Sequence, residues 1–337
     1  MPIQAAYVTW DTVSIPHSWN THDVVDDIKG YYRGEAWYLK RFMVGEQNRG
    51  KKAYLEFKAI NQEAEVYVNG SLAGSHVGGY TAFIVDITPY IQYGQENEVL
   101  VKANNRFNED VPTLTADFTF FGGIYRDVIL TFTDKVHFSM TSHGSSGVLV
   151  STPKVSEAQA DIEIKGQLLN ETNSTRKIKV VSSIKDAQSQ TVATATTSHN
   201  VRPGMPISFA NVVKGFESPK LWSPDNPYLY RVVTQIIDRA SNTVLDEVSA
   251  TLGFRWFRFD AEKGFFLNGK HLKLMGTNRH QDYPGLANAL PKGLHERDVE
   301  LVKAMGSNFL RVSHYPQDPS ILEACEKIPL QPTINLS

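Results

Sequence analysis

The stretch NFLRVSHYP, from Asn308 to Pro316, has the apolar side chains of a buried strand, yet it also contains Arg311 and runs straight into His314. A charged side chain is rarely placed in a protein interior without a partner, because its desolvation costs several kcal/mol. Arg311 therefore either pairs with an acid inside the protein or faces a wet, polar cavity. The fold of the neighbouring segments decides between the two.

The segments before this stretch predict a hairpin, a loop and a helix. GFFLNGKHLKLMG (264–276) turns at Asn268-Gly269 and ends in a predicted apolar strand, and the irregular stretch TNRHQDYPGLANALPKG (277–293) follows it. LHERDVELVKAMG (294–306) then predicts a helix that stops at Gly306. Its apolar side is predicted from four residues: Val299, Leu301, Val302 and Met305.

After the strand, Asp318-Pro319 begins a second predicted helix, PSILEACEK (319–327). Strand, long loop, helix, strand, loop and helix form the beginning of a (β/α)8 barrel, in which the loops after the strands form the active face. Residues 254–337 are therefore predicted to begin such a barrel. Arg311 and His314 are expected where a strand meets that face.

The residues before 254 predict a multidomain, mainly β chain with two separate sandwiches. In residues 1–135 turn signals recur at short intervals, as at Asn69-Gly70, and no helical period appears, which predicts a jelly-roll sandwich. In residues 136–253, strands of about five to eight residues predict an immunoglobulin-like sandwich of about seven strands. The boundary is placed just before the patch HGSSG (143–147).

Composition narrows the class of partner. The formal charge is −2 at pH 7 and no basic run carries interleaved aromatic residues, so nucleic acid is not an expected partner. The apolar runs are strand-sized, well short of the about 18–20 residues that a membrane helix needs. We therefore expect a soluble protein without a membrane partner. The N-terminus lacks a secretion signal, which leaves a cytoplasmic protein or a periplasmic or secreted one whose signal was removed.

Several chemistries have no support in the sequence. There is no glycine-rich phosphate loop after a strand, no histidine pair at zinc spacing and no serine in a nucleophile elbow. His295-Glu296 lacks the second histidine of a metalloprotease motif, and the single Cys325 excludes an intrachain disulfide. No metal and no other cofactor is therefore expected in this chain.

Six distinctive segments follow one another along the chain: IPHSWN (15–20), YYRGEAWYLKRF (31–42), VYVNG (66–70), DFTFFGGIYRDVIL (117–130), GTNRHQDYPG (276–285) and NFLRVSHYP (308–316). In these segments and their order the chain resembles glycoside hydrolase family 2, and among its members the β-galactosidases. NRHQD (278–282) favours a galactosidase, because glucuronidase relatives tend to carry lysine after the asparagine. The resemblance implies a jelly-roll sugar-binding domain, an immunoglobulin-like domain and a catalytic barrel that cleaves β-linked sugars with retention.

The resemblance also assigns substrate-binding residues. It implies that Asp117 reaches the sugar from the jelly-roll domain, that His280 contacts the sugar, and that Arg311 and His314 hold the substrate and position the catalytic acids. The alternatives are a turn aspartate, a surface histidine, an ion-paired core arginine and a satisfied core histidine. Asn105 is a further weak candidate. Strict alternation would place Arg311 and His314 on opposite faces, so both serve one site only if His314 lies beyond the strand end.

Family members use two glutamates, an acid/base and a nucleophile, on barrel strands after the SHYP segment, and a divalent metal is possible in the intact enzyme. Neither glutamate is expected before residue 337, and Glu326, Pro329 and LQPTINLS depart from the family pattern. We interpret the tail as that of a barrel truncated by a shortened or frameshifted reading frame. The alternative is a true sequence variant of the family. Its open strand edge near NFLRVSHY predicts self-association or a homo-oligomer.

Two functions of different class follow. In the first, the chain is the N-terminal half of a β-galactosidase or of a β-glucuronidase-like relative. In the second, it is a standalone carbohydrate-binding or structural module. The coding sequence downstream of Ser337 separates them, because the first requires an apolar strand and two glutamate segments there in some frame.

The 337-residue chain alone is expected to hydrolyse aryl β-D-galactosides no faster than background. Loss of a general acid by itself costs about 10²–10⁴ in rate, and the nucleophile is expected to be missing as well. Turnover comparable to that of a full-length relative, in a preparation free of host galactosidase, would contradict this expectation. Glu35 and Glu262 would then be the first carboxylates to test.

Overall fold

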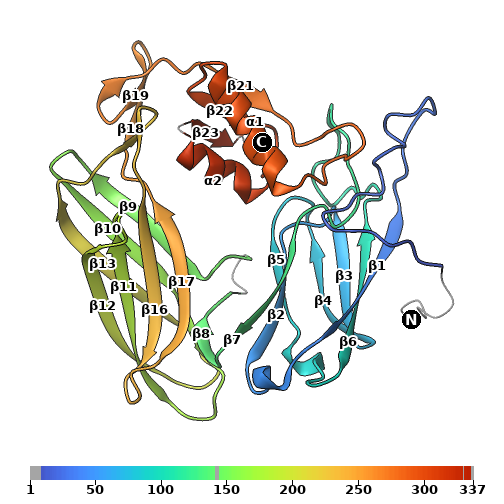
Figure 1. Ribbon diagram of the computed structural model, residues 1–337, viewed down its shortest axis with the longest axis horizontal. Coiled ribbons are helices and arrows are strands. Elements are labelled where there is room, and N and C mark those ends of the chain that lie inside the picture. The colour runs from blue at the N-terminus through green and yellow to red at the C-terminus, as the bar shows by residue number, and fades with distance from the viewer. Residues whose placement is uncertain (1–8, 141–143, 329, 335–337) are drawn as a thin grey trace. The chain divides into compact units, whose positions relative to one another are not determined.

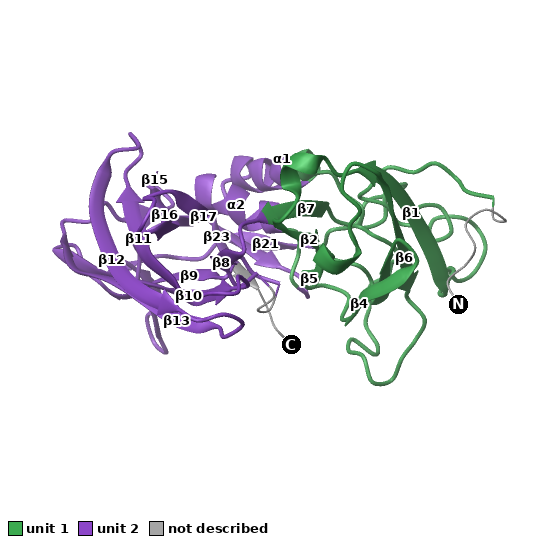
Figure 2. Ribbon diagram, turned by 90° about the horizontal axis from the view of Figure 1, so that it is seen from below, with its two compact units in different colours: residues 1–132, 280–294, 316–318 green, residues 133–279, 295–315, 319–337 purple. Residues whose placement is uncertain are grey.

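The computed structural model describes residues 9–140, 144–328 and 330–334. The chain divides into two compact units, one of residues 1–132, 280–294 and 316–318 and one of residues 133–279, 295–315 and 319–337 (Figure 2). Each unit is described by itself. Most of the N-terminal segment, the first residue of HGSSG, Pro329 and the last residues of the tail lie outside the described residues.

The first unit contains a sandwich of two sheets, ordered β1-β6-β3-β4 and β5-β2-β7. Strand alternation builds its core: Ala64, Val66 and Val68 of β3 are buried on one face, and the residues between them are partly exposed. Its elements are β1 (Glu35–Met43), β2 (Lys52–Phe57), β3 (Glu63–Val68), β4 (Ser71–Val77), β5 (Phe83–Asp86), β6 (Glu96–Asn104) and β7 (Val128–Thr133), with 3-10 turns η2 (Glu46–Asn48) and η3 (Thr88–Tyr90).

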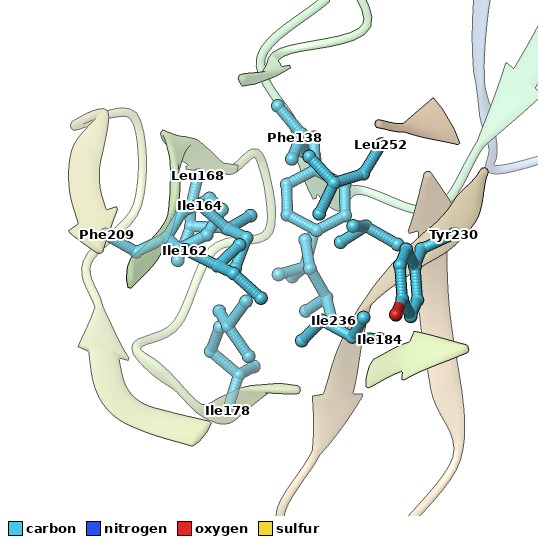
Figure 3. Close-up of a cluster of buried hydrophobic side chains, with 14 of the residues drawn as sticks. Phe138, Ile162, Ile164, Leu168, Ile178, Ile184, Phe209, Tyr230, Ile236 and Leu252 are labelled. Carbon is cyan, nitrogen blue, oxygen red and sulfur yellow. The ribbon is translucent and has the colours of Figure 1, made fainter. Parts of the chain in front are cut away.

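The second unit contains another sandwich, with sheets β13-β10-β8 and β12-β11-β16-β17, and β9 also pairs with β10 (Figure 1). Ile162, Ile164 and Leu168 of β10 meet the isoleucines of the facing sheet in a core that excludes water (Figure 3). Its elements are β8 (Val136–Phe138), β9 (Val148–Val155), β10 (Gln159–Asn170), β11 (Arg176–Lys185), β12 (Thr191–Val201), β13 (Ile207–Glu217), β16 (Tyr230–Asp238) and β17 (Val244–Leu252). Strands β14 (Trp222–Ser223) and β15 (Asn226–Pro227) form a separate two-stranded sheet.

The sequence predicts seven strands in this sandwich, whereas its two sheets contain four strands each. The difference lies at one edge, where β8 pairs with Leu168–Asn170 and β9 pairs with the earlier part of the same strand β10. Strands β8 and β9 together pair along one side of β10 and so occupy the place of one edge strand. The mainly β fold class with two sandwiches is confirmed.

Residues 254–334 supply two further sheets and both α-helices. The small antiparallel sheet β18-β19-β20 turns at Asn268-Gly269, where φ is 50° and 77°, as the hairpin signal predicts. The second sheet, β21-β22-β23, is parallel. The elements are β18 (Phe257–Asp260), β19 (Gly264–Leu267), β20 (Lys270–His271), β21 (Gly276–Arg279), α1 (Lys292–Ala304), β22 (Phe309–Val312), α2 (Pro319–Lys327) and β23 (Gln331–Ile334).

Three details of this region differ from the sequence expectations. The strand before the long loop is β21, starting at Gly276, rather than the apolar run LKLM (272–275) before it. Helix α1 ends near Gly306 as predicted, but its buried residues are His295, Val299 and Val302, while Met305 is 70% exposed. Residues 295, 299 and 302 recur at helical spacing, and Met305 lies beyond the last helical residue, which explains the error.

The third difference concerns the strand edge. The sequence predicts two parallel strands with NFLRVSHY at an open edge, but Gln331–Ile334 forms a third strand, and β22 lies between β21 and β23. The fully buried Leu330 anchors the chain before β23, and the Gln331 N–H donates to the Asn308 carbonyl (2.9 Å). Strand β22 is therefore not the exposed edge that the sequence predicts, and self-association of the chain stays a prediction.

Burial in the second sandwich predicts unequal effects of one substitution at two sites. Val180→Ala on β11 removes a fully buried side chain and is expected to lower the free energy of unfolding by about 2 kcal/mol. Val192→Ala on the neighbouring strand β12 removes the same atoms from a side chain that is 42% exposed, and should change it by less than about 0.5 kcal/mol. Calorimetry of both variants measures the difference, and equal losses would contradict the assigned faces.

Candidate functional site

A long connection between β6 and β7 carries the first candidate residue and is tied down by Asn105. The Asn105 side chain accepts from the Gly34 N–H (2.8 Å) and donates to the Phe120 carbonyl (2.9 Å), and its own carbonyl accepts from Arg33 Nε (2.7 Å). Asn105 is fully buried. It is thus a structural residue that joins the start of β1 to the end of this connection.

Asp117 lies in this connection and is exposed to solvent. Its neighbour Phe118 is partly buried, and its ring lies 5.4 Å from the Phe120 ring and 6.0 Å from the His280 ring. Among the described residues no hydrogen-bond partner holds the Asp117 carboxylate. Within the first unit, Phe118 therefore connects the segment of Asp117 to His280, and an exposed acid stands beside that contact.

His280 follows the last residue of β21 in the chain and is partly buried. The next residue, Gln281, is 1% exposed, and its Oε1 accepts from Nη2 of Arg126 (3.4 Å). The same Nη2 donates to the Pro316 carbonyl (2.7 Å). The segment that carries His280 is thereby attached to the sandwich of the first unit.

Arg311 and His314 belong to the second unit and are hydrogen-bonded to each other. Nη2 of Arg311 donates to Nδ1 of His314 (3.0 Å), and Nη1 donates to Oγ of Ser313 (3.0 Å). Strand β22 ends at Val312, so His314 lies beyond the strand end. Because a guanidinium only donates, a neutral His314 ring carries its proton on Nε2.

The structure shows how exposed Arg311 is and which groups surround it. Arg311 is partly exposed rather than fully buried, and among the described residues it has no carboxylate partner. Two of its donors bond Ser313 and the His314 ring, neither of which is a carboxylate, so its charge is uncompensated among the described residues. Such a cation can hold a carboxylate or the oxygen atoms of a polar ligand.

Two residues of this site escaped the sequence analysis. Phe118 had a signal, since an aromatic residue beside an acid can offer a flat apolar surface next to a hydrogen-bond acceptor. Arg126 had the same signal as Arg311, a charged residue in a strand-like apolar run, FGGIYRDV. Its partners lie far away in the sequence and could not be deduced from spacing.

Neither a reactive thiol nor a metal-binding cluster is present in the described ranges. Burial raises the pKa of the Cys325 thiol to about 12, so it is not a thiolate at neutral pH. In the described ranges no group of three or more His, Cys, Asp or Glu side chains is placed to hold a metal ion. Within the same ranges no helix has the length and apolarity needed to cross a membrane.

Comparison with protein families gives three matches in one order. The sugar binding domain of glycosyl hydrolases family 2 matches residues 3–134, the model named glycosyl hydrolases family 2 matches residues 148–255, and the TIM barrel domain of that family matches residues 260–331. The three matches follow one another along nearly the whole chain.

Individual proteins show the same relationship. A putative beta-glucuronidase of Formosa agariphila is 37% identical over 95% of this chain and 37% of its own length, and a beta-galactosidase of Thermoanaerobacter pseudethanolicus is 34% identical over 95% of this chain and 42% of its own length. A crystal structure of Bacteroides uniformis beta-glucuronidase has 40% identity and a TM-score of 0.92 over 96% of this chain and 38% of that one. The chain spans less than half the length of these relatives.

The geometry at Asn105 predicts graded effects of two substitutions. Asn105→Ala leaves the Gly34 N–H and the Phe120 carbonyl without their buried partner, and is expected to lower the free energy of unfolding by about 2–4 kcal/mol. Asn105→Asp keeps the acceptor for Gly34 but sets a buried carboxylate oxygen against the Phe120 carbonyl, which costs more than the loss of a hydrogen bond. Thermal unfolding at neutral pH should therefore rank wild type above N105A and N105A above N105D, and an unaffected N105A would refute the structural role.

Proposed function

Because this chain belongs to glycosyl hydrolase family 2, we propose that it supplies the sugar-binding sandwich and the first barrel strands of a retaining β-glycosidase. One observation carries the proposal. Strands β21 and β22 are parallel neighbours, and His280 and the Ser313-His314 pair follow their carboxyl ends in the chain. In a (β/α)8 barrel this is the edge at which active sites are built.

The roles proposed for this chain are recognition and orientation. In retaining glycosidases two carboxyl groups about 5–5.5 Å apart perform the cleavage through a covalent intermediate. Arg311, which donates to His314 and Ser313 and has no acidic partner in the described residues, would orient such a carboxylate. Asp117, His280 and His314 would exchange hydrogen bonds with sugar hydroxyls, and the ring of Phe118 would face an apolar side of the sugar.

A terminal β-D-galactosyl residue is the proposed substrate. Arg279, the residue after Asn278, is 8% exposed, and its guanidinium pairs with Asp298 through Nη2 (2.6 Å) and Nε (2.7 Å). A buried arginine that is neutralised in this way is not available to bind an acidic sugar. This supports a neutral sugar.

A β-D-glucuronosyl substrate is the second candidate. Relatives with the printed name beta-glucuronidase match this chain at least as well as those named beta-galactosidase. A glucuronide adds a carboxylate that requires a cation, and Arg311 is one whose charge is uncompensated among the described residues.

Titration of the chain with methyl β-D-galactoside and methyl β-D-glucuronide, followed by ligand NMR, tests the proposal. We expect the galactoside to bind at least about tenfold more tightly, which corresponds to about 1.4 kcal/mol. His280→Ala should weaken its binding, whereas His271→Ala, at an exposed histidine on β20, should leave it unchanged. Tighter binding of the glucuronide would favour the second candidate, and binding of neither would refute the proposed function of this chain.

A further inference from the structure

Arg126 is a buried cation whose partners in the described part of the chain are all neutral. It is 5% exposed, and it belongs to the apolar run that leads into β7. Its Nη1 donates to the Tyr80 carbonyl (3.2 Å) and more distantly to the Lys58 carbonyl (3.5 Å), while Nη2 donates to the Pro316 carbonyl (2.7 Å) and to Oε1 of Gln281 (3.4 Å). One guanidinium thus holds four separate points of the chain.

This arrangement requires an arginine. A planar guanidinium presents donors in a fixed fork, so it can reach acceptors on several sides at once, whereas a lysine ammonium is a single point of charge on a flexible stem. Among the described residues, the charge of Arg126 is stabilised by oriented oxygen dipoles and by the ring of Tyr125, whose centroid lies 5.1 Å from Cζ. Displacement of any of the four segments would leave part of the cation unsolvated.

The neighbouring residue acts on the same segment. Tyr125 is 1% exposed, its hydroxyl donates to the Gly79 carbonyl (2.6 Å), and its ring packs with Ala59, Tyr80 and Ala289. Ala289 lies in the segment 280–294 that also contains Gln281. Two successive side chains of the sandwich, one apolar and one charged, therefore hold this segment within the first unit.

We propose that Arg126 is a positioning residue for sugar recognition, which acts through Gln281 on the adjacent His280. Arg126 itself need not touch the sugar. The His280 ring lies beside Phe118, and the hydrogen bond from Arg126 to Gln281 sets where the chain places that ring. A displacement of about 1 Å at a binding group can cost about 10²-fold in function. This inference rests on the proposed function and names the residue that sets its geometry.

A purely structural role for Arg126 makes a different prediction. It would lower the stability of the chain but leave the sugar affinity of the folded molecules unchanged. A positioning role lowers the affinity of folded molecules and loosens the segment 280–294, while the strands of the sandwich stay protected. Sugar affinity and local hydrogen exchange, measured on the same folded sample, separate the two roles.

The test compares Arg126→Met, Arg126→Lys and Gln281→Leu in the full chain. We expect hydrogen exchange in 280–294 to accelerate at least about tenfold in each variant, with β1 and β6 unchanged, and the affinity for the glycoside that wild type binds to fall about tenfold or more. Arg49→Met is the control, because Arg49 also stands over an aromatic ring, Tyr93 at 5.2 Å, but lies at an exposed turn.

Two further measurements keep the test decisive. Guanidinium at millimolar concentration should restore sugar affinity to Arg126→Gly, and urea should not. The double variant Arg126→Met/Gln281→Leu should bind sugar no more weakly than Arg126→Met alone, because both substitutions break one connection. Wild-type affinity in folded Arg126→Met would overturn this inference alone, whereas a wild-type chain that binds no glycoside would overturn the proposed function and this inference with it.

Discussion

The parallel pairing of β21 with β22 is the constraint on which the candidate site depends. Its register places Arg279 opposite Val312, and the Ser313 N–H continues the pairing by donating to the Arg279 carbonyl (3.1 Å). Parallel strands cannot be joined by a tight turn, so a loop and helix α1 must separate them in the chain. Ser313 and His314 therefore follow a strand end that backbone hydrogen bonds hold in place, and their side chains can vary without loss of the sheet.

Three arginines of the chain show different surroundings for a poorly solvated cation. Arg279 pairs with the carboxylate of Asp298 and is neutralised. Arg126 is surrounded by carbonyl oxygens and an aromatic ring. Arg311 is bonded to Ser313 and His314, and its charge remains uncompensated among the described residues. The ion pair of Arg279 neutralises its charge, and the carbonyl oxygens around Arg126 connect separate segments of the chain. The uncompensated charge of Arg311 is suited to binding a carboxylate or the oxygen atoms of a polar ligand.

The sequence predicted the features that depend on local periodicity and turn chemistry. Alternation identified both sandwiches, and Asn268-Gly269 adopts the positive φ values that its hairpin requires. Features that depend on distant partners were missed. Strand β23 has a sequence, QPTI, without a strong strand signal, and forms because Leu330 and the Asn308 carbonyl hold it beside β22. The contact of Phe118 with His280 joins residues whose proximity only the folded chain provides. The binding roles of Asp117, His280, Arg311 and His314 stay predictions.

The buried thiol of Cys325 gives this protein a built-in chemical reporter. It is the single cysteine of the chain, it lies in α2 among Val299, Leu310 and Ile321, and it is completely shielded from solvent. Alkylating reagents can reach it only when α2 detaches from the parallel sheet. The labelling rate of one atom therefore reads out the opening of the barrel segment, separately from any motion in the two sandwiches, without the introduction of a probe.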